Sequence, residues 1–101
     1  ATMETKSFTK VVLIEFPRRG AHAIAFVTGE TKGELRRLTG DNHMKVFIPT
    51  TPNPTSGFIV FADPSEYTEL NMTIEEGIKY VISGGIVSPE QAEKIIADSS
   101  V

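Results

Sequence analysis

The hydroxyl-rich segment at residues 50–57 is the part of the sequence best suited to binding chemistry. It contains three Thr, one Ser and two Pro, with no charge and no large apolar side chain. Its hydroxyls and backbone amides could hydrogen-bond an extended partner or an anion, and its prolines would reduce the entropy lost on binding. The candidate binding residues are Thr50, Thr51, Asn53, Thr55, Ser56 and Gly57.

The same segment also fits a rigid structural turn, in which prolines restrict the chain and hydroxyls satisfy backbone groups. A phosphate-binding loop fits less well, because Gly57 precedes a predicted strand instead of a helix and the segment has no Lys. The sequence leaves a partner-binding loop and a structural turn as the two alternatives.

No set of residues forms a recognisable catalytic motif. Ser56, His22 and Asp63 supply the ingredients of a triad, but the chain has no Gly-x-Ser-x-Gly elbow. With two His and no Cys, we also expect no metal, no cofactor and no disulfide. Each His has a structural interpretation, at a strand start for His22 and in a turn for His43. A hydrolase or small-ligand site that combines loop hydroxyls with His22 or Arg18 is the alternative.

Two small basic clusters stand outside this loop. Arg18 and Arg19 fall in one predicted turn, and Lys32, Arg36 and Arg37 fall in a polar connection. Ordinary solvated charge explains both clusters. If the domain is held at a membrane, either cluster could contact anionic headgroups, at roughly 1 kcal/mol per charge near the surface.

Four segments have the composition of β-strands, and a fifth is shorter. They are residues 8–16, 21–28, 44–49 and 58–62, with 67–70 as the short one. Pro17 to Gly20 predicts a turn between the first two strands. In the second strand Ile24 and Phe26 share one face. The other face carries small residues that could admit a closely packed helix, namely Ala21, Ala23, Ala25 and Val27.

Two helices are expected near the C-terminus. Thr73 and Glu76 match a capping box, and Ile74, Ile78, Val81 and Ile82 form an apolar stripe that should cover the sheet. Gly84 and Gly85 supply the helix end. Ser88, Pro89 and Gln91 predict the start of a second short helix. A further short helical turn is expected at residues 34–38, where Leu35 and Leu38 could anchor it.

The length indicates a single domain, and the order of the expected strands and helices indicates the α+β class. The chain has 101 residues, 40% of them hydrophobic and 23% charged, and a net charge of -3. This charge gives no attraction to nucleic acid, and no apolar run approaches the about 18 to 20 residues that span a bilayer. We expect a disordered or non-native terminus at residues 1–7, one soluble domain at 8–97 and a frayed end at 98–101. Its sheet should hold four or five mainly antiparallel strands, open or partly closed into a barrel.

Three segments together resemble the continuous-vascular-ring (COV-like) family. They are VVLIEFPRRGAHAIAFVTGE at residues 11–30, VFIPTTPNPTSGFIVF at 46–61 and MTIEEGIKYVISGGIVSP at 72–89. The resemblance implies a membrane protein of unknown biochemical function, in which transmembrane helices precede a soluble C-terminal region like this one. It also implies that the intact protein is membrane-anchored and that this region faces the cytoplasm. It supplies no catalytic residues.

These observations favour a noncatalytic interaction or assembly module. The expected partner is a protein, or a second copy of the chain joined through an exposed strand or through the helix that carries Ile95 and Ile96. The membrane contact would come through an anchor outside the chain.

Overall fold

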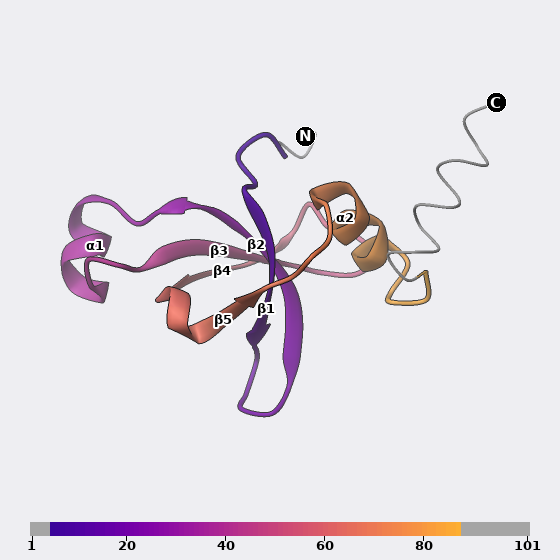
Figure 1. Cartoon of the computed structure of the whole chain (residues 1–101), viewed down its shortest axis with the longest axis horizontal. Helices are drawn as coiled ribbons and strands as arrows, with labels where there is room; N and C mark the ends of the chain where they lie inside the picture. The colour runs from indigo at the N-terminus through magenta and orange to yellow at the C-terminus, as the bar shows by residue number, and fades with distance from the viewer. Residues whose placement is uncertain (1–4, 88–101) are drawn as a thin grey trace.

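The computed structural model describes residues 5–87 and has one five-stranded antiparallel sheet (Figure 1). Its strands are β1 (Lys10–Glu15), β2 (His22–Glu30), β3 (Met44–Pro49), β4 (Gly57–Ala62) and β5 (Tyr67–Glu69), in the spatial order β4-β3-β2-β1-β5. Two α-helices, α1 (Gly33–Thr39) and α2 (Ile74–Ile82), and the single-turn helix η1 (Pro64–Glu66) complete it. This confirms the α+β class and shows that the sheet is open.

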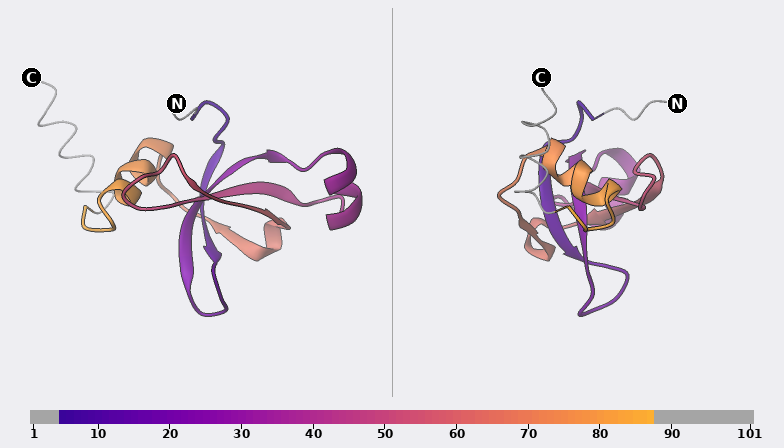
Figure 2. Two further views of the ribbon diagram at one scale, coloured as in Figure 1. Left: turned by 180° about the vertical axis from the view of Figure 1, so that it is seen from behind. Right: turned by 90° about the vertical axis from the view of Figure 1, so that its right-hand side faces the viewer.

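The sheet is bent where β2 passes from one hairpin to the next. The β2–β3 register shifts between Val27 and Gly29, where Gly29 has a φ of 147°. A bulge of this kind bends a strand and increases its twist. As a result, the β1–β2 and β3–β4 hairpins point in different directions (Figure 2).

The main core lies on the concave face of this bent sheet. Alternate residues of the first four strands are buried there, as the period of two requires. They are Val12, Ile14, Ala25, Val27, Val46, Ile48 and Ala62. Phe16 and Phe58 extend this core, with their ring centroids 5.2 Å apart.

Helix α2 covers the opposite face of the sheet, and this corrects the expectation that a helix packs on the small residues of β2. Ala25 belongs to the concave core, whereas Phe26 lies beneath α2. A Cβ on Gly77 would lie 3.0 Å from Phe26 Cε1 and 3.2 Å from Val11 Cγ2. The space for close approach is therefore made by a glycine of the helix, and not by the alanines of the strand.

The capping box that begins α2 is confirmed. Thr73 N–H donates to Glu76 Oε1 at 2.8 Å, and Glu76 N–H donates to Thr73 Oγ1 at 3.1 Å. The predicted stripe is only partly buried, because Val81 packs inward while Ile82 is 47% exposed. The second predicted C-terminal helix lies outside the described residues. Within residues 5–87 no helix is long and apolar enough to cross a bilayer.

Candidate functional site

The segment at residues 50–57 connects β3 to β4 as a turn held by its own polar groups. Thr50 Oγ1 lies 2.6 Å from the Asn53 carbonyl oxygen and 2.8 Å from Ser56 Oγ. Asn53 Oδ1 accepts hydrogen bonds from the backbone N–H and the hydroxyl of Thr55. Four of the six candidate binding residues thus bond to one another. This geometry fits the structural-turn alternative and leaves partner binding by these residues as a proposal.

Thr51 fastens the turn to the C-terminal end of α2. Its hydroxyl donates to the Val81 carbonyl at 2.9 Å. Beside this bond lies an open hollow of about 290 Å³, which Thr51 lines together with His22 and Tyr80. The structure therefore brings His22 and a loop hydroxyl to one place. It holds Arg18 elsewhere, with its guanidinium donating to the Arg19 carbonyl at 3.0 Å.

Gly57 ends the turn and begins an unpaired edge of the sheet. A Cβ at this position would overlap the carbonyl oxygen of Ile48, so the close approach of the two strands requires glycine. From here β4 runs as Gly-Phe-Ile-Val-Phe-Ala, with β3 on one side and no neighbouring strand in the described sheet on the other. Phe58 and Ile59 are 56% and 60% exposed.

The β3–β4 register shows which backbone groups face outward. Thr50 N–H bonds the Ser56 carbonyl at 2.9 Å, and these residues continue the register that pairs Pro49 with Gly57. Bonded and non-bonded pairs alternate along an antiparallel ladder. Phe58, Val60 and Ala62 therefore bond to β3. Gly57, Ile59 and Phe61 direct their N–H and C=O groups away from it. We call these three residues the open edge.

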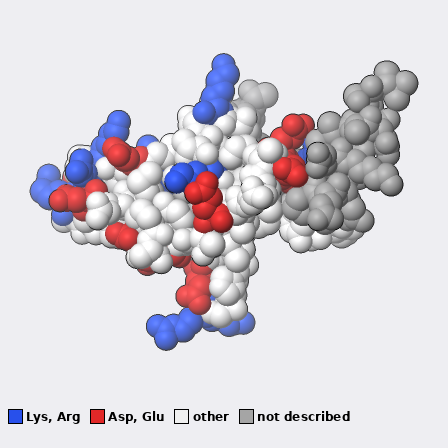
Figure 3. All heavy atoms as spheres, viewed as in Figure 1, with Lys and Arg blue, Asp and Glu red and all other residues white. Residues whose placement is uncertain are grey.

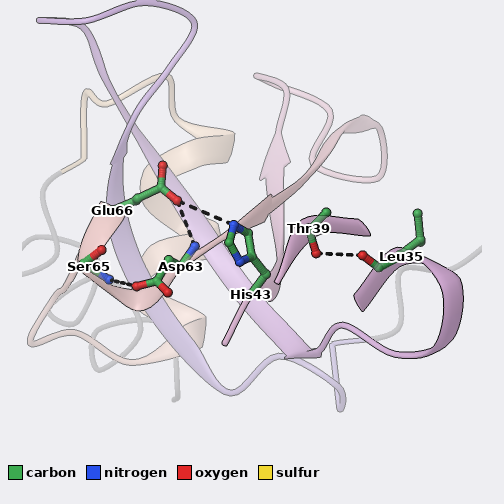
Figure 4. Close-up of polar contacts among 6 residues, drawn as sticks. All are labelled: Leu35, Thr39, His43, Asp63, Ser65 and Glu66. Atoms are coloured by element: carbon green, nitrogen blue, oxygen red, sulfur yellow. Dashed lines mark hydrogen bonds and ion pairs between the residues drawn. The ribbon is translucent and has the colours of Figure 1, made fainter. Parts of the chain in front are cut away.

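A polar corner joins β4 to β5, and sequence reasoning missed it (Figure 4). Asp63 Oδ1 accepts a hydrogen bond from Ser65 N–H, and Glu66 Oε1 accepts one from Asp63 N–H, both at 2.9 Å. The same Glu66 oxygen lies 4.0 Å from Nε2 of His43. The signal was present, because Asp63-Pro64-Ser65-Glu66 has the capping-box spacing recognised at Thr73.

The pKa values of two side chains at this corner, Asp63 and Tyr67, are shifted from their ordinary values. Hydrogen bonds from the backbone and side chain of Ser65 lower the pKa of Asp63, and His43 adds to this effect. Burial raises the pKa of Tyr67, with further contributions from Asp63 and Glu69. Tyr67 lines an open hollow of about 460 Å³ between the end of β4 and β5. His43 is mostly buried, and its Nδ1 has no hydrogen-bond partner among the described residues.

The structure does not bring Ser56 and Asp63 together, as a catalytic triad of these two residues with His22 would require. Ser56 and Asp63 flank the two ends of β4, whose six residues extend about 20 Å. Ser56 bonds to Thr50, and Asp63 bonds to Ser65. Within residues 5–87 no group of three or more His, Asp and Glu side chains is arranged to hold a metal ion.

The two basic clusters lie at different ends of the molecule. Figure 3 shows basic side chains at the β1–β2 turn, which carries Arg18 and Arg19, and others around α1, which carries Arg36 and Arg37 and follows Lys32. Arg36 Nε is 3.7 Å from Asp41 Oδ1, with both side chains at least half exposed. The two predicted basic clusters are therefore separate from each other in the described chain, and we call them the basic tips.

Comparisons with known proteins agree with the family resemblance. The family model described as "Protein of unknown function (DUF502)" matches residues 1–56. In Arabidopsis thaliana, the chain is 30% identical to Protein LIKE COV 1 and to Protein CONTINUOUS VASCULAR RING 1, over 86 residues in each case. These matches cover 85% of the chain, but the chain spans only about a third of either relative's length. No solved structure matches. The chain thus belongs to the DUF502 family of proteins of unknown function, and it is a COV-like member of it.

Proposed function

We propose that the chain is a noncatalytic interaction module of a membrane-anchored protein. The observation that carries this proposal is the open edge. Here a strand without charged side chains has backbone groups that no described strand pairs with, beside the exposed side chains of Phe58 and Ile59. An unpaired strand of this kind binds another extended segment by main-chain hydrogen bonds, while its side chains select the partner. The turn at residues 50–57 supports this role by fixing where the edge begins.

The membrane anchor and a cytoplasmic position belong to the same proposal. Their support is the similarity to COV-like proteins, of which this chain covers a third. The two basic tips would then contact anionic headgroups. Co-sedimentation with vesicles tests this contact. Greater recovery on vesicles containing phosphatidylserine than on neutral ones supports it, and equal recovery removes it.

Photo-crosslinking in cells tests the interaction role. The photoreactive residue is placed at Ile59 on the open edge or at Asn53 in the turn, within the full-length protein, and Asp41 serves as the control position. Asp41 is exposed and lies in the turn between α1 and β3. A discrete adduct from Ile59 or Asn53 that is absent from Asp41 supports the module. Adducts that are equal at all three positions contradict it.

Small-ligand binding is the second candidate function. The hollow lined by His22, Thr51 and Tyr80 favours this function, because a hydroxyl of the loop and an imidazole line the same space. The bond from Thr51 to Val81 weighs against it, because that hydroxyl is already engaged. An NMR fragment screen decides the question. Shift changes that cluster at these three residues favour a ligand site, and scattered changes exclude it.

A further inference from the structure

We infer that the open edge pairs with the open edge of a second copy of this chain, as antiparallel strands about a two-fold axis at Ile59. This inference rests on the proposed interaction role and names the partner. It joins the two sheets into one continuous sheet through β4.

The two exposed edges of the sheet differ in their protection against pairing. Strand β5 has three residues and carries Glu69, whose carboxylate is 3.6 Å from Lys10 Nζ. Short length and charge are ordinary ways in which proteins block an edge. Strand β4 has six residues without charge or proline. The sequence blocks one edge and leaves the other available.

The pattern of outward-facing groups makes β4 complementary to itself. Outward hydrogen-bonding positions fall at Gly57, Ile59 and Phe61, which are evenly spaced around Ile59. Two antiparallel copies centred there pair Ile59 with its own counterpart and Gly57 with the second copy's Phe61. Each outward N–H then meets a C=O, and the contact is isologous, as in most two-fold dimers.

The side chains agree with this register. Placing Phe61 opposite Gly57 lets an aromatic ring cover a glycine, which is a known stabilising cross-strand arrangement. The non-bonded positions place Phe58 opposite the second copy's Val60, so exposed apolar surface is covered on the concave face as well. No charge opposes another charge anywhere in the paired strands.

Sedimentation velocity of the purified chain over micromolar to millimolar concentration tests the pairing. We expect the wild type to dimerise, and Ile59→Lys to raise the dissociation constant at least about tenfold, because two like charges then meet at the axis. Leu38→Lys is the matched control, since Leu38 is 72% exposed on α1. It should change the dissociation constant less than about twofold, because Leu38 lies on α1, outside the paired strands. A wild type that stays monomeric, or equal effects of the two variants, overturns the inference.

Disulfide trapping gives a second readout that does not depend on a disruptive variant. The chain contains no cysteine, so Ile59→Cys introduces a single thiol at the axis. Directly opposed bonded residues have Cα atoms about 5.5 Å apart, within disulfide range. Mild oxidation should give a covalent dimer from Ile59→Cys and far less from Leu38→Cys. Equal yields contradict self-pairing. A cellular adduct of Ile59 to a different protein, with no dimer in either assay, would retain the interaction module and reject only the second copy as its partner.

Discussion

At the scale of single residues, the chemistry suggested by residues 50–57 is used inside the fold. Thr50, Ser56, Thr55 and Asn53 satisfy one another, and Thr51 bonds to α2. Sequence reasoning identified these residues as unusual, and it allowed a turn as an explanation. It could not choose between a turn and a binding loop, because the choice depends on which hydroxyls find partners after folding.

Gly57 is the residue on which the turn depends most. We predict that Gly57→Ala lowers the free energy of unfolding by at least about 2 kcal/mol, because the added Cβ meets a backbone carbonyl that cannot move alone. Urea denaturation measures the change.

Gly33→Ala is the control variant, because it introduces backbone strain without an overlap between the added Cβ and another atom. Gly33 has a φ of 62° and no atom within 4 Å of an added Cβ. In this variant only the strain of the left-handed conformation should lower the free energy of unfolding, by about 1 to 2 kcal/mol. A loss at Gly57 no greater than at Gly33 would contradict the overlap.

Ionisation of Asp63 makes the folding stability of the chain depend on pH. Its pKa is lowered from 3.8 in the folded state, so its contribution to stability is fully present above pH 3.8 and is lost as the pH falls through the folded-state pKa. We predict that Asp63→Asn is less stable than the wild type at pH 7 and that this difference narrows as the pH falls below 3.8. Urea denaturation at pH 7 and at a series of lower pH values decides this, and a difference that stays constant or widens as the pH falls refutes the account.

At the scale of elements, local signals predicted the strands and α2 well. Strand composition and the capping box at Thr73 depend on neighbouring residues, so they can be seen in one sequence. The face on which α2 packs was predicted wrongly, since Ala23 and Ala25 suggested room on the concave side. That choice is made by non-local packing, in which Gly77 meets Phe26 and Val11.

Close packing at Gly77 holds α2 on the sheet. We predict that Gly77→Leu lowers the free energy of unfolding by more than about 2 kcal/mol, since the side chain would force Phe26 and Val11 apart. Glu75→Leu, an exposed position on the same helix, should change it by less than about 0.5 kcal/mol. Thermal or urea unfolding followed by circular dichroism compares the two. Equal stability of the two variants would show that α2 does not depend on this contact.

At the scale of the whole molecule, the sheet formed within residues 5–87 has β4 at one edge, and this strand carries no charge. The sequence predicted β4 and allowed self-association through an exposed strand or through the helix with Ile95 and Ile96. It could not show which strand is exposed, because the order β4-β3-β2-β1-β5 is a property of the complete sheet. In the proposed function, the basic tips would contact lipid headgroups and the open edge would contact a second strand.

Residue-resolved amide hydrogen exchange, measured by NMR at low and high protein concentration, tests the central claim most directly. In dilute protein we expect slow exchange at Phe58, Val60 and Ala62, which bond to β3, and fast exchange at Gly57, Ile59 and Phe61. At high concentration the three fast amides should become protected, while amides of the Arg18–Gly20 turn should not change. Uniform protection along β4 in dilute protein, or open-edge amides that stay fast at high concentration, would contradict an edge that takes up a second strand.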